Sequence, residues 1–426
     1  MIKNSLHKIL ILSLFIIVSS CIDEIPIETV SEFESVLVVE ATITNEFKQQ
    51  EIKLTRSYVL DSLEPPPELS AIVKVIGSNG FNMSFTETET GLYKSDEAFA
   101  AAPNVDYNLE IVTSDGREYA SSNMQLTEPT TIDNLYIERD FNENDEEGVS
   151  IRVDAYDPTG NSKFYRYTYE ETYKIIAPKY SPFELLINND DFPYPLTMFI
   201  GFTDQELIDF FVTRQFRPVS EQVCYNTVAS NRVIQENTNQ FEEDRIDGFR
   251  LRFISQQNYI MSHRYSILVR QHIQSPEAFI YYKTLSDMSQ TETVFSTTQP
   301  GFLSGNINSL TNSEEKVVGF FEVSSVDEKR VYFNYADLFP KEDLPPYFRD
   351  CRAILTPLLF WAPPGAPEIG SSPIQYMISQ GRQYWDENLG SDGETKITMN
   401  PYQLVLNECG DCTFLGETQV PEFWED

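Results

Sequence analysis

The residues of this sequence best suited to chemistry are four cysteines, Cys224, Cys351, Cys409 and Cys412. Cys409 and Cys412 form a C-G-D-C motif, a spacing found in thioredoxin-like redox sites, where the first cysteine begins a helix that follows a strand. Here the pair lies near the C-terminus and is followed by Thr-Phe-Leu-Gly. Four cysteines in an exported chain most often form two structural disulfides. We therefore expect two bridges among these residues, with three possible connectivities.

Metal ligands are scarce in the sequence. A zinc site would need a second pair of ligands beside the C-G-D-C motif, yet His263 and His272, the histidines after residue 20, lie far from it. The loop 141–148 offers oxygen atoms at alternate positions, but Asp145 stands where a calcium loop has glycine, and Ile151 where it has glutamate. We expect no metal and no cofactor, and interpret this loop as a solvated hairpin tip.

The N-terminal segment has the pattern of a lipoprotein signal peptide. Lys3 and Lys8 accompany the apolar run ILILSLFIIV, which is too short to span a bilayer because a spanning helix needs roughly 20 residues. Two serines then lead to Cys21, so cleavage after them would leave this cysteine as the first mature residue. We expect 1–20 to be the signal peptide, Cys21 to carry a diacylglycerol and an acyl chain such as palmitate, and 21–34 to be a tether. The alternative is an ordinary signal peptide with an incidental cysteine.

Two acids that follow the cysteine after one intervening residue suggest where the protein is localised. Asp23 and Glu24 resemble the export signal that sends lipoproteins to the outer cell surface in Bacteroidota. We therefore expect a protein anchored by lipid in the outer membrane and facing the extracellular side.

The charge balance excludes some classes of partner. Removing residues 1–20 leaves 29 basic residues against 66 acidic ones. Such a chain is unsuited to nucleic acid, whose phosphates need a basic surface, and to peripheral binding on anionic lipid. With 41% hydrophobic and 13% aromatic residues, it can nevertheless bury large cores.

The alternation of apolar residues predicts a mainly β fold. We expect a small N-terminal β-sandwich at 35–128, of the immunoglobulin-like or carboxypeptidase-regulatory-like kind, and a larger, fibronectin-like sandwich at 129–340. The second domain contains an irregular insertion at 177–245, with a helix candidate after Thr203, and one clear helix that begins after Ser275. The proline-containing segment 341–426, with three of the four cysteines outside the N-terminal segment, is expected to pack on the second domain.

Several motifs together resemble a known family. In chain order they are EQVCYNT (221–227), YSILVRQHIQSPEAFIYY (265–282), QPGFLSGNI (299–307), VVGFFEVSSVDEKRVYF (317–333) and CGDCTFLGETQVPEFW (409–424). The chain is similar to a family of Bacteroidota outer-membrane lipoproteins known as domain-of-unknown-function family 4249. One departure is Gly319-Phe320-Phe321, where Gly-Tyr-Phe is common. The resemblance implies a TonB-dependent receptor as partner and supplies no catalytic residues.

Three functional hypotheses follow. The first is a non-enzymatic surface lipoprotein that serves a TonB-dependent transporter as an accessory or ligand-binding partner, docking through loops of the β-domains and the insertion 177–245. The second is a glycan-binding surface lipoprotein, in which the Trp361 loop beside Pro363 and Pro364 would offer a stacking platform. The third is a hydrolase with paired carboxylates, although G-x-S-x-G is absent and no acid pair stands out.

Overall fold

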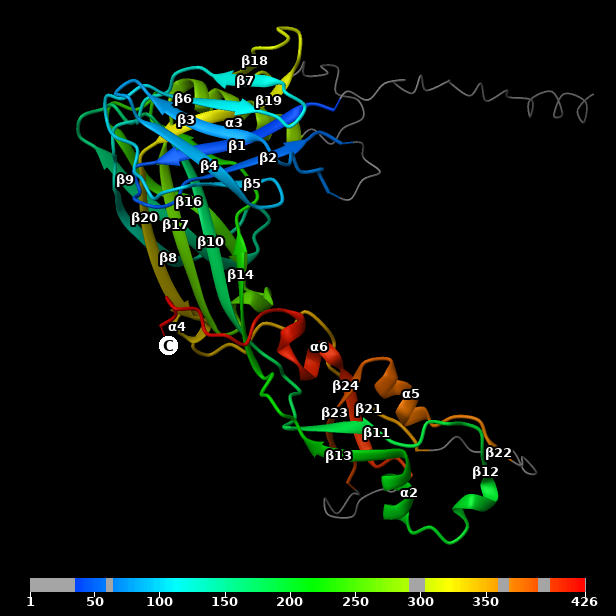
Figure 1. Ribbon diagram of the computed structural model, residues 1–426. Helices are drawn as coiled ribbons and strands as arrows, with labels where there is room; N and C mark the ends of the chain where they lie inside the picture. The colour runs from blue at the N-terminus through cyan, green and yellow to red at the C-terminus, as the bar shows by residue number, and fades with distance from the viewer. Residues whose placement is uncertain (1–34, 59–63, 291–302, 359–367, 390–398, 426) are drawn as a thin grey trace, which may run out of the picture.

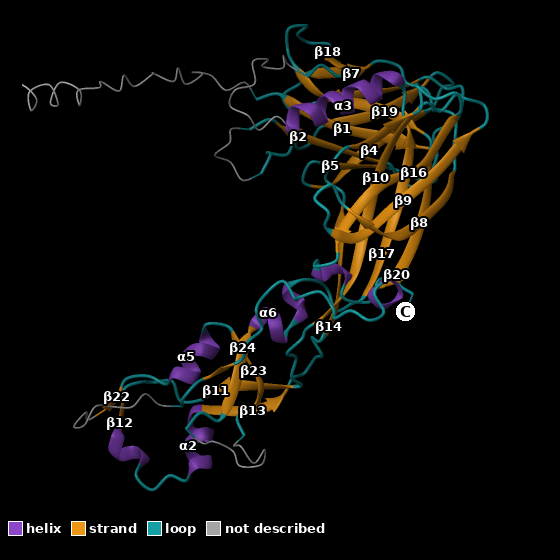
Figure 2. Cartoon of the chain, turned by 180° about the vertical axis from the view of Figure 1, so that it is seen from behind, coloured by secondary structure: helices purple, strands orange, loops and turns teal. Residues whose placement is uncertain are grey.

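The computed structural model describes residues 35–58, 64–290, 303–358, 368–389 and 399–425, and these form a mainly β molecule. Figure 1 shows three units in succession, with the distal one projecting from the far end of the middle one. The reverse view in Figure 2 shows the same arrangement. The mainly β fold predicted from the sequence is confirmed. No helix within the described ranges has both the length and the apolar character needed to cross a membrane.

The first unit is a path of nine hydrogen-bonded strands that enclose one apolar core. Burial alternates along its first strand, where Leu37, Val39 and Ala41 face the core. In sheet order the strands are β18 (Ile307–Ser309), β7 (Glu118–Ser121), β6 (Tyr107–Val112), β3 (Ile72–Gly77), β4 (Asn82–Glu89), β5 (Leu92–Ser95), β2 (Glu51–Arg56), β1 (Leu37–Thr44) and β19 (Val317–Ser324).

The predicted boundary of this first domain at residue 128 needs correction. Strand β19 pairs in parallel with β1, with Leu37 opposite Val317, and β18 pairs with β7 at the other edge. The cause is burial, because β19 contributes Phe321 and Val323 to the same core as β1. The N-terminal unit therefore includes residues 307–324, which we had predicted to belong to the second domain.

The second unit consists of two sheets that face each other across a core of their own. Strand β10 occupies the centre of the larger sheet and pairs with β14, β15 and β17. The larger sheet contains β14 (Val223–Ala229), β15 (Ile234–Asn237), β10 (Phe164–Ile176), β17 (Arg264–Ile273) and β20 (Val326–Asn334), and the smaller contains β16 (Asp244–Ser255), β9 (Glu147–Asp157) and β8 (Ile132–Phe141). The acidic loop 141–148 lies at the β8–β9 turn, as predicted.

Two predicted helices begin where the capping residues place them. Helix α3 (Pro276–Gln290) follows Ser275, whose hydroxyl accepts the backbone N–H of Ala278 at 3.1 Å. Helix α2 (Asp204–Phe211) follows Thr203, which forms a reciprocal capping box with Glu206. Two short helical turns follow strands of the second unit: η2 (Tyr259–Met261) follows β16, and α4 (Tyr335–Leu338) follows β20.

The third unit, here called the distal unit, joins two segments far apart in sequence, 183–219 and 354–406. We had predicted an irregular insertion (177–245) and a C-terminal segment (341–426) packed on the second domain, and both predictions need correction. Neither segment can bury its apolar residues alone, so they share one core. Its elements are β11 (Phe183–Ile187), β12 (Tyr194–Pro195), η1 (Leu196–Phe199), α2, β13 (Val212–Phe216), β21 (Ile354–Leu355), β22 (Glu368–Ile369), α5 (Pro373–Ser379), β23 (Arg382–Glu387) and β24 (Tyr402–Leu406).

The end of the chain does return to the second unit, as expected of the tail. Helix α6 (Asn407–Gly410) and the turn η3 (Cys412–Phe414) lead it back. The tail then lies along β14 and β20, where Tyr225 and Glu417 form a backbone bridge and the Tyr332 hydroxyl donates to the carbonyl of Phe423 at 2.5 Å. Of the described residues in 341–426, this last stretch and residues 342–348, where Tyr347 packs against the core of the second unit, therefore cover the second sandwich.

Candidate functional site

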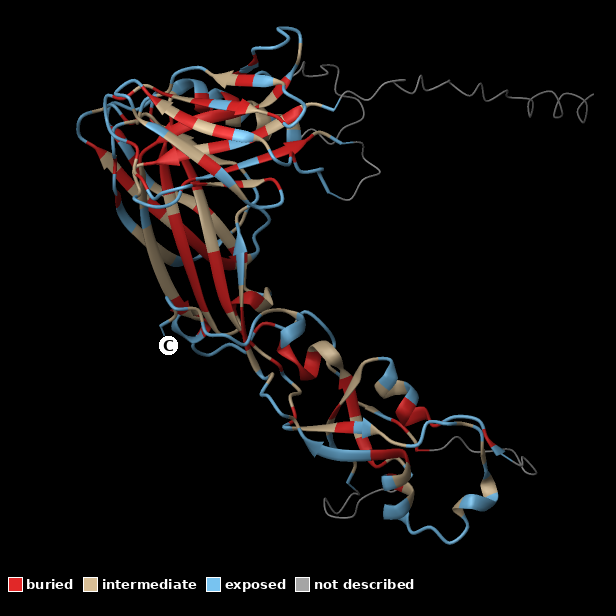
Figure 3. Cartoon of the chain, viewed as in Figure 1, coloured by how far each residue is buried: buried red, intermediate tan, exposed pale blue. Residues whose placement is uncertain are grey.

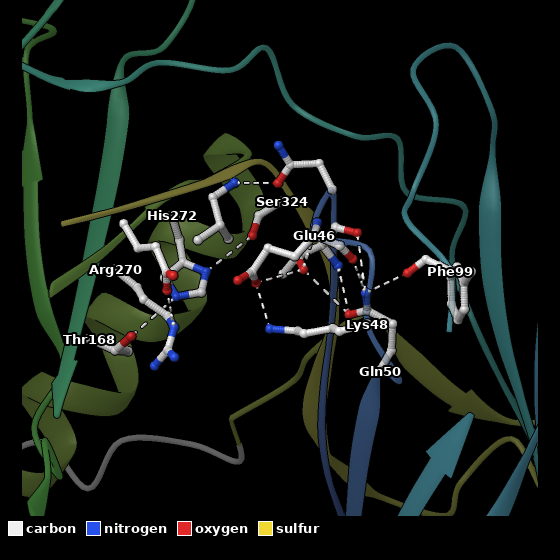
Figure 4. Close-up of polar contacts among 12 residues, drawn as sticks. Glu46, Lys48, Gln50, Phe99, Thr168, Arg270, His272 and Ser324 are labelled. Atoms are coloured by element: carbon white, nitrogen blue, oxygen red, sulfur yellow. Dashed lines mark hydrogen bonds and ion pairs between the residues drawn. The ribbon is translucent and has the colours of Figure 1, made fainter. Parts of the chain in front are cut away.

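A buried histidine lies where the first two units meet (Figure 4). His272, on β17, contacts the hydroxyl of Thr168 through Nε2 at 3.3 Å and that of Ser324 through Nδ1 at 3.4 Å. Burial, followed by the nearby charge of Arg166, holds its pKa well below the usual value. The imidazole is therefore neutral and held by hydroxyls on β10 and β19, which is a structural arrangement.

An ion pair next to this histidine joins the same two units. Arg166 of β10 donates to Glu322 of β19 at 2.7 Å, and Gln274 donates to the other carboxylate oxygen at 3.1 Å. The Glu322 side chain is 1% exposed and that of Arg166 is 11% exposed. The guanidinium also lies 4.7 Å from the centroid of the Tyr282 ring. Since both charges have partners, this cluster fixes how the units pack.

The cysteines form two disulfides, as predicted, and the structure selects one of the three connectivities. Cys224 is bonded to Cys412, and Cys351 to Cys409. The two cysteines of the C-G-D-C motif thus have different partners. A thioredoxin-like site needs a bond between those two cysteines, so the structural interpretation is the one that fits. The first bridge joins β14 to η3, and the second joins the loop at Cys351 to α6, at the neck where the distal unit leaves the second sandwich.

A pocket of about 480 Å³ lies at this neck, between β11, β13 and β23. Four aromatic rings line it, from Tyr180, Phe183, Tyr384 and Trp385. The Arg214 guanidinium lies 4.6 Å from the Phe183 ring centroid, and the Lys179 ammonium lies 3.7 Å from that of Trp385. Arg214 also pairs with Glu387 at 2.7 Å. The pocket combines flat apolar surfaces with hydrogen-bonding groups, a combination that suits a polar organic ligand.

The structure gives less support for an exposed stacking platform or for a metal site. Each parallel stacked ring pair in the described ranges includes a fully buried ring such as Phe211 or Tyr167, so none forms an exposed platform. A second pocket, of about 380 Å³, collects Glu236, Glu243 and Asp247 beside Arg245. Within the described ranges no three histidine, cysteine or acidic side chains are grouped closely enough to hold a metal ion.

The most distinctive surface belongs to the distal unit. It holds about a fifth of the described residues, yet ten of the 24 exposed large apolar side chains. These are Leu186, Met198, Ile200, Phe202, Phe216, Val219, Leu355, Tyr376, Leu389 and Met399. Figure 3 shows β13 almost entirely exposed on this unit. Contiguous exposed apolar side chains mark protein interaction sites, so this unit is the candidate docking surface.

The sequence did not lead us to predict these exposed apolar residues, although one apolar run among them is visible in it. The run Met-Phe-Ile-Gly-Phe at 198–202 is apolar and lies in a stretch of acidic, irregular sequence. The residues that sequence reasoning did single out at the N-terminus, Cys21, Asp23 and Glu24, lie outside the described residues. The Trp361 loop of the glycan-binding hypothesis also lies outside them.

The sequence profile of the domain of unknown function DUF4249 matches residues 22–330, more than two thirds of the chain. The chain belongs to the DUF4249 family. The region matched to DUF4249 contains the whole first unit, most of the second and the segment 183–219 of the distal unit.

Other comparisons add little to this assignment. None of the curated proteins compared with the chain matches it. Among solved structures, a DUF4785 family protein from Legionella pneumophila is 9% identical, with 55% of this chain and 51% of that chain covered and a TM-score of 0.16. A similarity this distant supports no conclusion about the DUF4249 chain.

Proposed function

We propose that this DUF4249 protein is a non-enzymatic surface lipoprotein of the outer membrane in Bacteroidota, which docks on a TonB-dependent transporter through its distal unit. The observation that carries the proposal is the concentration of exposed apolar side chains on that unit. The lipoprotein pattern that ends at Cys21 supports the anchor, and Asp23 and Glu24 support surface export.

The arrangement of the units suits such a role. Strand β1, the first described strand, lies in the first unit, and the distal unit projects from the opposite end of the molecule (Figures 1 and 2). A chain anchored by Cys21 would therefore carry its apolar surface away from its own attachment point. Two disulfides at the neck and a buried ion pair between the first two units hold the parts together.

The test is co-purification of the tagged, full-length protein from outer membranes solubilised in mild detergent, at native expression. The proposal predicts that a TonB-dependent receptor is recovered in a fixed ratio to the lipoprotein and identified by mass spectrometry. Recovery of the lipoprotein alone would overturn the proposal.

A second candidate function, glycan binding, is favoured by the neck pocket and its four aromatic rings. Stacking on an aromatic ring and hydrogen bonds to polar groups are the usual means of holding a sugar. Binding of an oligosaccharide panel to the wild-type protein, lost in the variant Trp385→Ala, would support this function. Equal retention of wild type and variant on the panel would argue against it.

A further inference from the structure

The tip of the distal unit carries an apolar loop, residues 198–202, here called the tip loop. Ile200 is 77% exposed, Met198 is 43% exposed and Phe202 is 38% exposed. Gly201 has a φ of +94°, which provides the turn in the middle of the loop. Figure 1 places this loop, between η1 and α2, at the end of the molecule farthest from the first unit.

Contacts between aromatic rings hold the tip loop on the α2 helix. The ring of Phe199 stacks on buried Phe211 with centroids 5.7 Å apart, and it lies 5.2 Å from the ring of Phe210. Because Phe199 points inward, its neighbours Met198 and Ile200 point outward. The capping box of Thr203 and Glu206 then fixes the start of α2 directly behind the loop. The outward direction of these apolar side chains is therefore built into the fold.

Acidic residues flank the tip loop on both sides in the sequence, and no basic residue lies between Lys179 and Arg214. Five of the six acids in that stretch are exposed: Asp190, Asp191, Asp204, Glu206 and Asp209. None of these five carboxylates forms an ion pair with a lysine or arginine in the described ranges of the chain. Hydrogen bonds from the Thr203 backbone N–H and hydroxyl lower the pKa of Glu206, which keeps it charged. We call these five residues the acidic rim.

We infer that the tip loop inserts into an apolar recess of an integral outer-membrane protein, and that lysine and arginine side chains border this recess. The inference rests on the proposed function and names the contact that the docking uses. An apolar centre with a charged border is the usual anatomy of a protein interface. The exposed carboxylates favour a partner with positive groups at this border, because complementary charges across an interface select and orient the partner. The same carboxylates would repel an anionic lipid surface or the strongly acidic surface of a second copy.

The first test places the photoreactive amino acid p-benzoylphenylalanine at Ile200 in the full-length protein in intact cells. The matched control places it at Phe47, which is 79% exposed on the first unit. The inference predicts a cross-link from position 200 to an integral outer-membrane protein, mapped to an apolar peptide bordered by lysine or arginine. A cross-link to a second copy, to lipid alone, or to a peptide without basic residues would overturn it.

The second test compares Ile200→Asp with Phe47→Asp in co-purification. Ile200→Asp is expected to reduce recovery of the partner roughly tenfold or more, whereas Phe47→Asp leaves recovery unchanged. Asp190→Asn/Asp191→Asn is expected to reduce recovery and to weaken its dependence on salt concentration, because two of the rim charges are removed. Thermal melting of each variant verifies that the fold is intact.

The outcomes separate this inference from the proposed function. A receptor that co-purifies and is cross-linked from Phe216, which is 71% exposed elsewhere on the distal unit, but not from position 200 overturns the tip-loop contact and leaves the proposed function standing. Absence of any receptor from wild-type purifications overturns both.

Discussion

At the scale of single residues, the interface between the first two units depends on a few buried polar groups. Arg166 and Glu322 are nearly inaccessible, so each charge depends on the other for its solvation. Arg166→Leu is expected to lower the free energy of unfolding by about 3–5 kcal/mol, because a buried carboxylate then lacks its partner. Arg166→Leu/Glu322→Leu is expected to recover much of that loss. Urea denaturation of both variants tests this, and a wild-type midpoint for the single variant would contradict it.

The neutral His272 makes stability depend on pH. Burial and the charges of Arg166, Lys48 and Arg270 hold its folded pKa well below the unfolded value of about 6.5. As the pH falls below about 6.5, the unfolded chain binds a proton that the folded chain does not, so the free energy of unfolding decreases by up to about 1.4 kcal/mol per pH unit. His272→Gln is expected to reduce this slope. Denaturation at pH values between about 7 and 5 measures how the free energy of unfolding depends on pH. An unchanged slope in the variant would show that His272 does not cause this dependence.

At the scale of elements, one glycine permits the pairing of β1 with β19. Gly319 has a φ of +149°, and a Cβ atom there would collide with the backbone carbonyl of Val39. Gly319→Ala is expected to cost about 1–3 kcal/mol or more of stability from backbone strain. Gly370→Ala is the control, because nothing lies within 4 Å of the position a Cβ would take. Equal melting temperatures for the two variants would show that the close approach is unimportant.

Helix starts, which depend on neighbouring residues, could be predicted from the sequence better than the long-range pairing of strands. Thr203 and Ser275 each begin a helix because capping is a local interaction. The pairing of β1 with β19 joins residues about 280 positions apart, and its register is set by a shared core that no local pattern reveals. The distal unit was missed for the same reason, since Tyr194 pairs with Ile369 across the chain. The cysteines could be recognised as disulfide-forming, but their pairing depended on the fold.

At the scale of the whole molecule, we propose that the anchor and the docking surface belong to different ends of the protein. Cys21→Ala is expected to abolish incorporation of a palmitate analogue and to release the protein from the membrane fraction, because acyl chains supply the attachment. Asp23→Asn/Glu24→Gln is expected to retain the label but to lose accessibility to protease added outside intact cells. Incorporation of the palmitate analogue into the Cys21→Ala variant would show that the lipid is attached elsewhere.

Docking of the distal unit on an outer-membrane receptor is tested by comparing two matched triple variants in co-purification. Ile200→Ser/Phe216→Ser/Met399→Ser removes three side chains that are 77%, 71% and 71% exposed on the distal unit. Phe47→Ser/Leu310→Ser/Ile280→Ser removes three that are 79%, 65% and 64% exposed on the first unit and helix α3. The first variant is expected to lose its TonB-dependent receptor, while the second retains it at the wild-type ratio. Retention by the first variant, or equal loss by both, would contradict it.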